Sequence, residues 1–256
     1  MRNIFLYFLV CTILFSCKNE GCTDPLATNF DTSFNKEDGS CEYIYNLNVE
    51  FSLNDGDIEL IKNDIISFEN NSFRIEKFKL YLSDISLVSN NGTNNLTDVF
   101  LYNLEDLSTH SLILSTSDES VREFNFSLGL DNVLNSTTPA DYPTDHPLGI
   151  NNGTYWAMNN SDSYIFAMIE GKLDTTGDGT FFNRTYHLAH DDLLKSVSLE
   201  KSIEFDNQLN GNIDIKIELK DVFNDLNFSS TLPHTSNNSP LAHQIMDNIK
   251  NAFKIQ

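Results

Sequence analysis

The sequence has few basic residues, and this shortage excludes one class of partner. Lysine and arginine together number 16 against 37 aspartate and glutamate residues, so the 256-residue chain has a formal net charge of −21. A surface of this charge repels nucleic acid and anionic lipid headgroups. We therefore expect no nucleic-acid partner, and we interpret the acidic surface as a source of solubility.

The local signatures of several enzyme classes are also missing. The chain contains no glycine-rich nucleotide-binding loop, no nucleophile elbow and no His-Glu-x-x-His motif. Carboxylates are plentiful, but no local pattern pairs two of them or marks a nucleophilic serine. We therefore expect that the protein is not an enzyme.

Long hydrophobic runs are missing except at the N-terminus. Arg2 precedes an apolar run from Ile4 to Phe15, which is too short to span a bilayer comfortably. Residues 1–17 are therefore predicted to be a signal peptide and not part of the fold. The pair Ser16-Cys17 at its end resembles a bacterial lipobox, in which the cysteine carries lipid. An ordinary cleaved signal is the alternative. We favour a lipoprotein of the cell envelope, held by outer-membrane lipid through Cys17 and facing the periplasm or the surface.

Cysteine is scarce, and its four positions predict one disulfide. Cys11 leaves with the signal peptide and Cys17 takes the lipid, so that Cys22 and Cys41 remain. Two such cysteines outside the cytoplasm are expected to pair, and closing this loop stabilises the segment by roughly 3 kcal/mol. Residues 18–43 are thus predicted to be a tether with a small disulfide-closed module, which resembles a module common in Bacteroidetes surface proteins.

Two acidic stretches raise the question of structural calcium. The carboxylates in the module, and those of Asp174–Gly179, are oxygen ligands of the kind that calcium prefers. Aspartate and glycine are equally favoured in tight turns. Turn formation is the simpler interpretation of both stretches, and structural calcium remains the alternative. The carboxylates of the module are Asp24, Asp31, Glu37 and Asp38.

Residues 44–256 show the alternation of apolar and polar residues that is typical of β-strands. In Asn212–Leu219 every second residue is apolar, and in Phe73–Val88 the residues Ile75, Lys77, Lys79 and Tyr81 share one parity. Turn-forming residues separate the strands, which predicts an all-β, antiparallel sandwich or barrel-like domain. The other predicted strands are Asn46–Leu53, Asp98–Leu104, Glu123–Leu130 and Ser196–Phe205.

The chain is predicted to end in an α-helix. Ser239 is a good N-cap and Pro240 suits the first turn. Apolar residues then recur every four positions and fill one arc of the helix, with His243 outside that arc. The residues of the arc are Leu241, Ala242, Ile245, Met246, Ile249, Ala252 and Phe253.

The stretch from Tyr155 to His190 contains the candidate functional residues. It has the only tryptophan, Trp156, an apolar strand, a Gly/Asp turn and a second strand that ends in His187 and His190. A hairpin would bring these histidines back toward Trp156. Residues three apart on a strand do not share a face, so one histidine at most is expected to face a common site. The pair alone is a weak signal for a metal. The loop Thr137–Asn152, which carries His146, precedes this stretch. Loops of this length in a compact domain usually have a function, so we expect one here.

Several stretches of residues 44–256 match one known family in order and spacing. They are Phe78–Leu87, Phe124–Asn135, His146–Leu148, Tyr155–Trp156, Tyr164–Gly171, Tyr186–Leu188 and His234–Phe253. In these stretches the chain resembles the MbnP-like family of exported copper-binding proteins. The resemblance implies a periplasmic or surface protein that binds copper, as Cu⁺ or Cu²⁺.

The resemblance also implies which residues bind the metal. In the better-understood members, histidines act together with a tryptophan that a partner di-haem enzyme of the MauG type oxidises to kynurenine. Carried over by position, the candidates are His146, His187, His234 and Trp156.

Two further residues are weaker candidates for metal binding. His190 stands where a glycine-like turn position is expected, and Met158 stands where many relatives have a second aromatic residue. The Met158 thioether is a soft ligand suited to Cu⁺, but filling a gap in the core is the commoner role of methionine.

Two functions from different classes follow. The first is an extracytoplasmic, lipid-anchored copper-binding protein for copper acquisition, storage or handover. The alternative is a surface adhesion or glycan-binding β-sandwich without a functional metal site, in which Trp156 and the tyrosines would form an exposed stacking platform.

Overall fold

The structure is a computed structural model that describes residues 18–68, 71–156, 162–228, 234–236 and 239–256, with residues 234–236 described by their backbone. It divides into two compact units, Met1–Ile44 and Tyr45–Gln256. Among the described residues, no helix has both the length and the apolar character needed to cross a membrane. The predicted signal peptide, with Cys17, lies outside these residues.

A disulfide joins Cys22 to Cys41 in the first unit, as the sequence predicts. The acidic side chains of this unit accept hydrogen bonds from nearby backbone N–H groups and so shape its turns. The donors are Leu26 to Asp24 (2.9 Å), Ser33 to Asp31 (2.8 Å), Thr23 to Glu37 (2.8 Å) and Ser40 to Asp38 (2.9 Å).

The second unit is built from two β-sheets with a C-terminal helix, which confirms the predicted fold class. The larger sheet runs in the order β12 (Lys195–Glu204), β7 (Ser120–Leu128), β4 (Asn71–Ser89), β10 (Ala167–Asp174), β11 (Phe182–Leu188) and β14 (His234–Ser236), with β3 (Ile65–Phe68) and β5 (Gly92–Asn103) also paired to β4. The smaller sheet consists of β15 (Phe253–Ile255), β13 (Asn210–Glu218), β1 (Tyr45–Asp55) and β2 (Ile58–Glu59), with β6 (Ser111–Thr116) paired to β1. A short ribbon joins β8 (Tyr155–Trp156) to β9 (Ser163–Tyr164).

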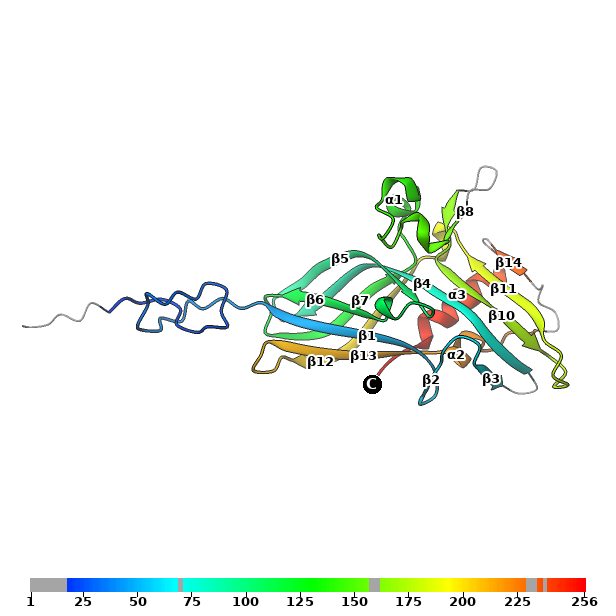
Figure 1. The fold of residues 1–256 in the computed structure, drawn as a ribbon, viewed down its shortest axis with the longest axis horizontal. Helices are drawn as coiled ribbons and strands as arrows, with labels where there is room; N and C mark the ends of the chain where they lie inside the picture. The colour runs from blue at the N-terminus through cyan, green and yellow to red at the C-terminus, as the bar shows by residue number, and fades with distance from the viewer. Residues whose placement is uncertain (1–17, 69–70, 157–161, 229–233, 237–238) are drawn as a thin grey trace, which may run out of the picture. The chain divides into compact units, whose positions relative to one another are not determined.

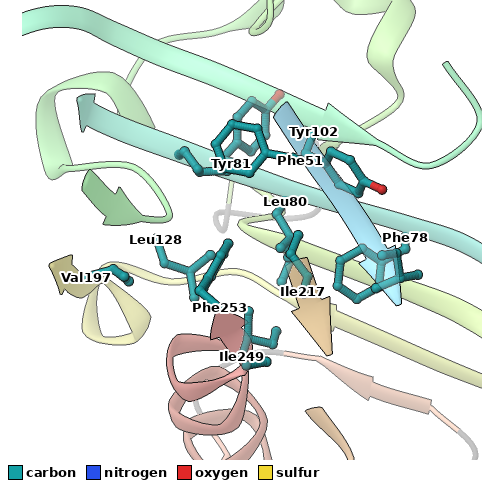
Figure 2. Packing of buried hydrophobic residues seen from close by; sticks show 14 of the residues in the cluster. Phe51, Phe78, Leu80, Tyr81, Tyr102, Leu128, Val197, Ile217, Ile249 and Phe253 are labelled. Carbon is teal, nitrogen blue, oxygen red and sulfur yellow. The ribbon is translucent and has the colours of Figure 1, made fainter. Parts of the chain in front are cut away.

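The apolar face of each sheet turns toward the other, and the helix α3 (Pro240–Ala252) completes the core (Figure 2). In β13 the side chains of Ile213, Ile215 and Ile217 are at most 1% exposed, as their strict alternation predicts. The smaller sheet is not purely antiparallel, because β1 and β13 run parallel, with Asn46 opposite Asn210 and Asn54 opposite Glu218.

The sequence predicts the start of α3 and most of its buried face. Of the predicted arc, Leu241 is only half-buried and Phe253 begins β15 and is not part of the helix. The Ser239 side chain accepts a hydrogen bond from the Ala242 N–H (3.1 Å), and Pro240 occupies the first turn. The buried residues of the helix are Ala242, Ile245, Met246, Ile249 and Ala252.

Strand β4 carries the core on one face and polar side chains on the other. Its pairing with β10 shifts register between Glu170 and Gly171, because β4 has one extra residue there. The bulge turns Ile75 into the core, although its parity predicted the same face as Lys77. That expectation was wrong because period-2 alternation does not survive a bulge.

A long excursion, defined here as residues 129–156 and 162–166, leaves the larger sheet at a single residue of β4. The Gly129 N–H donates to the Tyr81 carbonyl (2.8 Å), and the Tyr81 N–H donates to the Phe166 carbonyl (2.9 Å). β7 and β10 therefore pair with β4 on either side of Tyr81 in its sequence. The excursion contains α1 (Asn132–Asn135), η2 (Pro139–Asp141), η3 (Ile150–Asn152) and the ribbon of β8 and β9 (Figure 1).

Buried tyrosine hydroxyls hold the excursion against the sheet. Tyr81 donates to the Pro147 carbonyl (2.8 Å) and lies 2.6 Å from the Thr154 hydroxyl, while Tyr164 donates to the Leu148 carbonyl (3.0 Å). Burial raises the pKa of Tyr164 to about 12 and raises the pKa of Tyr81 further, so both phenols stay protonated as donors.

We expect Tyr81→Phe to lower the free energy of unfolding by about 1 kcal/mol, because the Pro147 carbonyl and the buried Thr154 hydroxyl each lose a hydrogen-bond partner; the Pro147 carbonyl keeps only its bond from the Asn152 amide (2.8 Å). Denaturant unfolding checks this value, and Trp156 emission should shift to the red as β8 loosens. Tyr142→Phe, which removes a hydroxyl from a half-buried ring of the same excursion, is the control. Equal stability of the Tyr81→Phe variant and the native protein would show that another contact anchors the excursion.

Candidate metal centre

Trp156 and His187 lie against each other where the excursion meets the larger sheet. Their ring centroids are 5.5 Å apart with an interplanar angle of 63°, an edge-to-face contact. Trp156 is half-buried against a small apolar cluster of Ile165, Met168 and Ala189. The β10–β11 hairpin brings His187 to Trp156, as the sequence predicts.

A carboxylate fixes the His187 ring from the opposite strand. Nε2 of His187 is 2.8 Å from Oε1 of Glu170, whose Oε2 is 2.9 Å from Nζ of Lys77. Partial burial alone would raise the pKa of Glu170, but the hydrogen bonds from Lys77 and His187 outweigh it and hold that pKa below its ordinary value. Glu170 is therefore an ionised acceptor that orients the imidazole.

Met168 is a candidate ligand that sequence reasoning missed. It is directly opposite His187 in the antiparallel pairing of β10 and β11, so the two side chains leave the sheet on the same face. Its side chain is 4% exposed and packs in the cluster with Trp156. The hairpin register could have found it, counted back from the Asp174–Gly179 turn. Met158, the thioether predicted instead, lies outside the described residues.

His146 lies elsewhere in the excursion. Its ring stacks on Tyr142, with centroids 4.5 Å apart and an interplanar angle of 12°, and its Nδ1 accepts the Leu148 N–H (3.1 Å). His146 does not join His187 and Glu170 in a tight group: among the described residues, the one set of three or more His, Cys, Asp or Glu side chains with ligand atoms within 4.8 Å of one another is Cys22, Glu37 and Cys41. The two sulfur atoms of that set form the disulfide, so they are not free thiolates.

The other two predicted histidines occupy different environments. The backbone of His234 in β14 pairs with Thr185, two residues before His187 on β11, and its side chain is not among those described. His190 follows β11 with a φ of 152°, and its half-exposed ring lies 3.6 Å from an Asp192 oxygen. A positive φ is costly for any residue but glycine, which agrees with the glycine-like position inferred from the sequence.

The chemistry of the Trp156 surroundings suits copper. Imidazole nitrogen binds both Cu⁺ and Cu²⁺, and a thioether favours Cu⁺. His187 and Met168 place an imidazole and a thioether on one face of the hairpin, where the Trp156 ring contacts His187 and packs in the cluster of Met168. This arrangement leaves Trp156 partly packed, unlike the open stacking platform of a glycan-binding surface.

The Asp174–Gly179 turn closes the hairpin that carries these donors. Both Asp174 oxygens accept backbone N–H groups: Oδ1 from Thr176 (2.9 Å) and Gly177 (2.8 Å), and Oδ2 from Gly179 (2.8 Å). The Thr176 hydrogen bond, with those of Gly179 and Gly177, outweighs burial and holds the pKa of Asp174 below its ordinary value of 3.8. The turn is thus formed by backbone amides around the carboxylate.

Because the folded pKa of Asp174 is depressed, its carboxylate stabilises the fold above the unfolded pKa near 3.8. That stability is lost as the pH falls from there through the lower folded pKa. Asp174→Asn should therefore lower stability at pH 7 and flatten the acid dependence below pH about 4. Unfolding free energies measured between pH 2 and pH 7 test this, and a rise in melting temperature on adding calcium would instead favour a calcium site.

Trp156 is the only tryptophan, so its emission reports the contact with His187 directly. We expect His187→Ala to raise the fluorescence yield, because an adjacent imidazole quenches indole emission. His110→Ala removes another half-buried histidine, which stacks on Tyr102, and should leave the yield unchanged. A similar yield in both variants would show that the rings are apart in solution.

Comparisons with known proteins identify the family and the fold of the chain. No curated protein matches the chain. Among solved structures, MbnP from Methylosinus trichosporium is similar, with 15% sequence identity and a TM-score of 0.53, and the similarity covers 77% of this chain and 82% of that chain. At this identity the likeness shows the fold. A sequence model of the family described as MbnP matches residues 24–244. The chain therefore belongs to the MbnP family, and membership suggests a copper-related role outside the cytoplasm.

Proposed function

We propose that this protein binds copper in the cell envelope and acts in copper acquisition, storage or handover, without being an enzyme. The contact between Trp156 and His187, with Met168 opposite His187, carries the proposal. Together they form the one place described here where an imidazole, a thioether and the single tryptophan meet. The lipid anchor at Cys17 would keep the protein at the outer membrane.

Each residue has a separate role in the proposed centre. His187 supplies imidazole nitrogen, Met168 supplies thioether sulfur, and Trp156 shields the donors from water. Glu170 and Lys77 keep the His187 ring in place, since a hydrogen-bonded carboxylate fixes the orientation of a ligand histidine. Bound copper is cargo in this role, held by soft and borderline donors that suit both of its oxidation states.

The remaining candidates extend this set. His146 and His234 are proposed as additional ligands, His146 from the excursion and His234 from β14, the strand paired with β11. A partner di-haem enzyme of the MauG type would act on Trp156. The half-buried position of Trp156, at the meeting of the excursion with the sheet, is compatible with access from one side.

Copper loading of the purified protein tests the proposal. Excess Cu⁺ is removed by dialysis, and the bound metal is counted by mass spectrometry of the intact protein. We expect stoichiometric copper in the native protein, loss in His187→Ala and at least about tenfold weaker binding in Met168→Leu, since one good ligand contributes more than about 1.4 kcal/mol.

His110→Ala is the matched control, because it removes a half-buried imidazole that packs against Tyr102 and not against Trp156, and it should retain copper. Equal copper in the His187→Ala variant and the native protein would reject His187 as a ligand. The mass of the peptide that contains Trp156, from the protein of its own cell, then shows whether Trp156 has been converted to kynurenine.

A further inference from the structure

The outer face of β4 and β10 carries an unusual concentration of positive charge. Arg74, Lys77 and Lys79 of β4 and Lys172 of β10 point outward there, whereas the inward neighbours Phe73, Ile75, Phe78, Ile169 and Leu173 are at most 1% exposed. These four residues, named here the cationic strip, are a quarter of all 16 lysines and arginines.

The strand register aligns the strip with the candidate metal centre. Lys172 is opposite Arg74, Glu170 is opposite Lys77 and Met168 is opposite Lys79, in three successive outward rows. The third row continues across β10 to His187, because Met168 is opposite His187 in the pairing of β10 with its neighbour β11. Figure 1 shows these two strands side by side. The strip therefore starts near the hairpin turn and ends at the proposed copper donors.

The positive charge of the strip is only partly neutralised. Glu170 pairs with Lys77 (2.9 Å), and Glu76 lies 3.6 Å from Arg74 and 3.5 Å from Lys172. Lys79 is less available than the other three, because its Nζ donates to the Asn152 carbonyl (2.8 Å) and it interacts with Glu105 and Asp106. Arg74, Lys77 and Lys172 against the two carboxylates leave a formal charge of +1, in a chain whose net charge is −21. The Lys77 and Lys172 side chains are 42% and 34% exposed, so their remaining N–H donors are accessible.

Size and charge decide which anion the strip suits. The end rows of the strip are four residues apart along the strand, a length of about 13 Å. A surface of this length is too small for a stable protein interface, which needs about 800 Å² on each partner. A large acidic partner or an anionic membrane would also meet the repulsion of the rest of the surface. A small anion close to the strip senses mainly the strip, because charges beyond about 8 Å are screened at physiological ionic strength.

We propose that the cationic strip binds a small organic anion with two or three carboxylates, and that copper reaches or leaves His187 as the chelate of such an anion. The second clause rests on the proposed function. Lysine and arginine pair with the carboxylates, and remaining oxygen atoms of the anion hold the metal. Met168 and His187, the two donors of the third row, then receive the metal from the anion.

Citrate is the probe, titrated into the metal-free protein and followed by calorimetry. We expect binding that weakens about threefold in Lys77→Gln or Lys172→Gln and about tenfold in the double variant, as expected for exposed ion pairs. Binding should also weaken as salt is added. Lys220→Gln is the matched control, since Lys220 is 41% exposed and pairs with Asp55 at 2.6 Å. Lys77→Arg should restore affinity.

Two results would overturn the proposal. The first is an absence of citrate binding to the native protein, or equal affinity in the double variant and the Lys220→Gln control. The second is tighter binding of polyglutamate than of citrate through the same lysines, which would assign the strip to an acidic macromolecule. Since these titrations contain no metal, failure of the copper site at His187 is measured separately by copper loading and leaves the citrate result unchanged.

Discussion

The hydrogen bonds of Tyr81 are the constraint on which the candidate centre depends. The backbone of Tyr81 forms hydrogen bonds with both ends of the excursion, at Gly129 and Phe166. Its hydroxyl forms hydrogen bonds within the excursion, with Pro147 and Thr154. Breaking hydrogen bonds that involve a buried hydroxyl is costly, so these bonds favour one position of the excursion over others. Trp156 reaches His187 because the excursion is held there.

The two faces of β4 have different roles: one packs in the core, and the other carries polar and charged side chains. The inward face contributes to the core shown in Figure 2, and the outward face carries the charged rows that lead to His187. The bulge at Glu76 makes this division possible, since it places Arg74 and Lys77 on the same face although their spacing is odd. A rigid core therefore supports the proposed ligands on one side of the same strands.

The sequence predicts what local pattern controls and misses what depends on long-range contacts. The alternation of apolar and polar residues predicted β13. The start of α3 was predicted from Ser239 and Pro240, and the hairpin pattern predicted that His187 lies near Trp156. The parallel partner of β1 could not be read from its residues, because alternation says nothing of which strand lies beside it. Met168 was missed for the same reason: its importance comes from the residue across the hairpin, which only the register supplies. The ligand roles of His146 and His234 stay predictions.

The parallel pairing of β1 with β13 has a consequence for the order of folding. The first strand of the domain needs a partner that begins at Asn210, more than 150 residues later, so the smaller sheet closes only after nearly the whole chain is available. Contacts of such separation form slowly because a long loop must close first. A chain that cannot finish its core remains unfolded for longer, and an unfolded chain is the form in which a protein of the proposed envelope location would be exported.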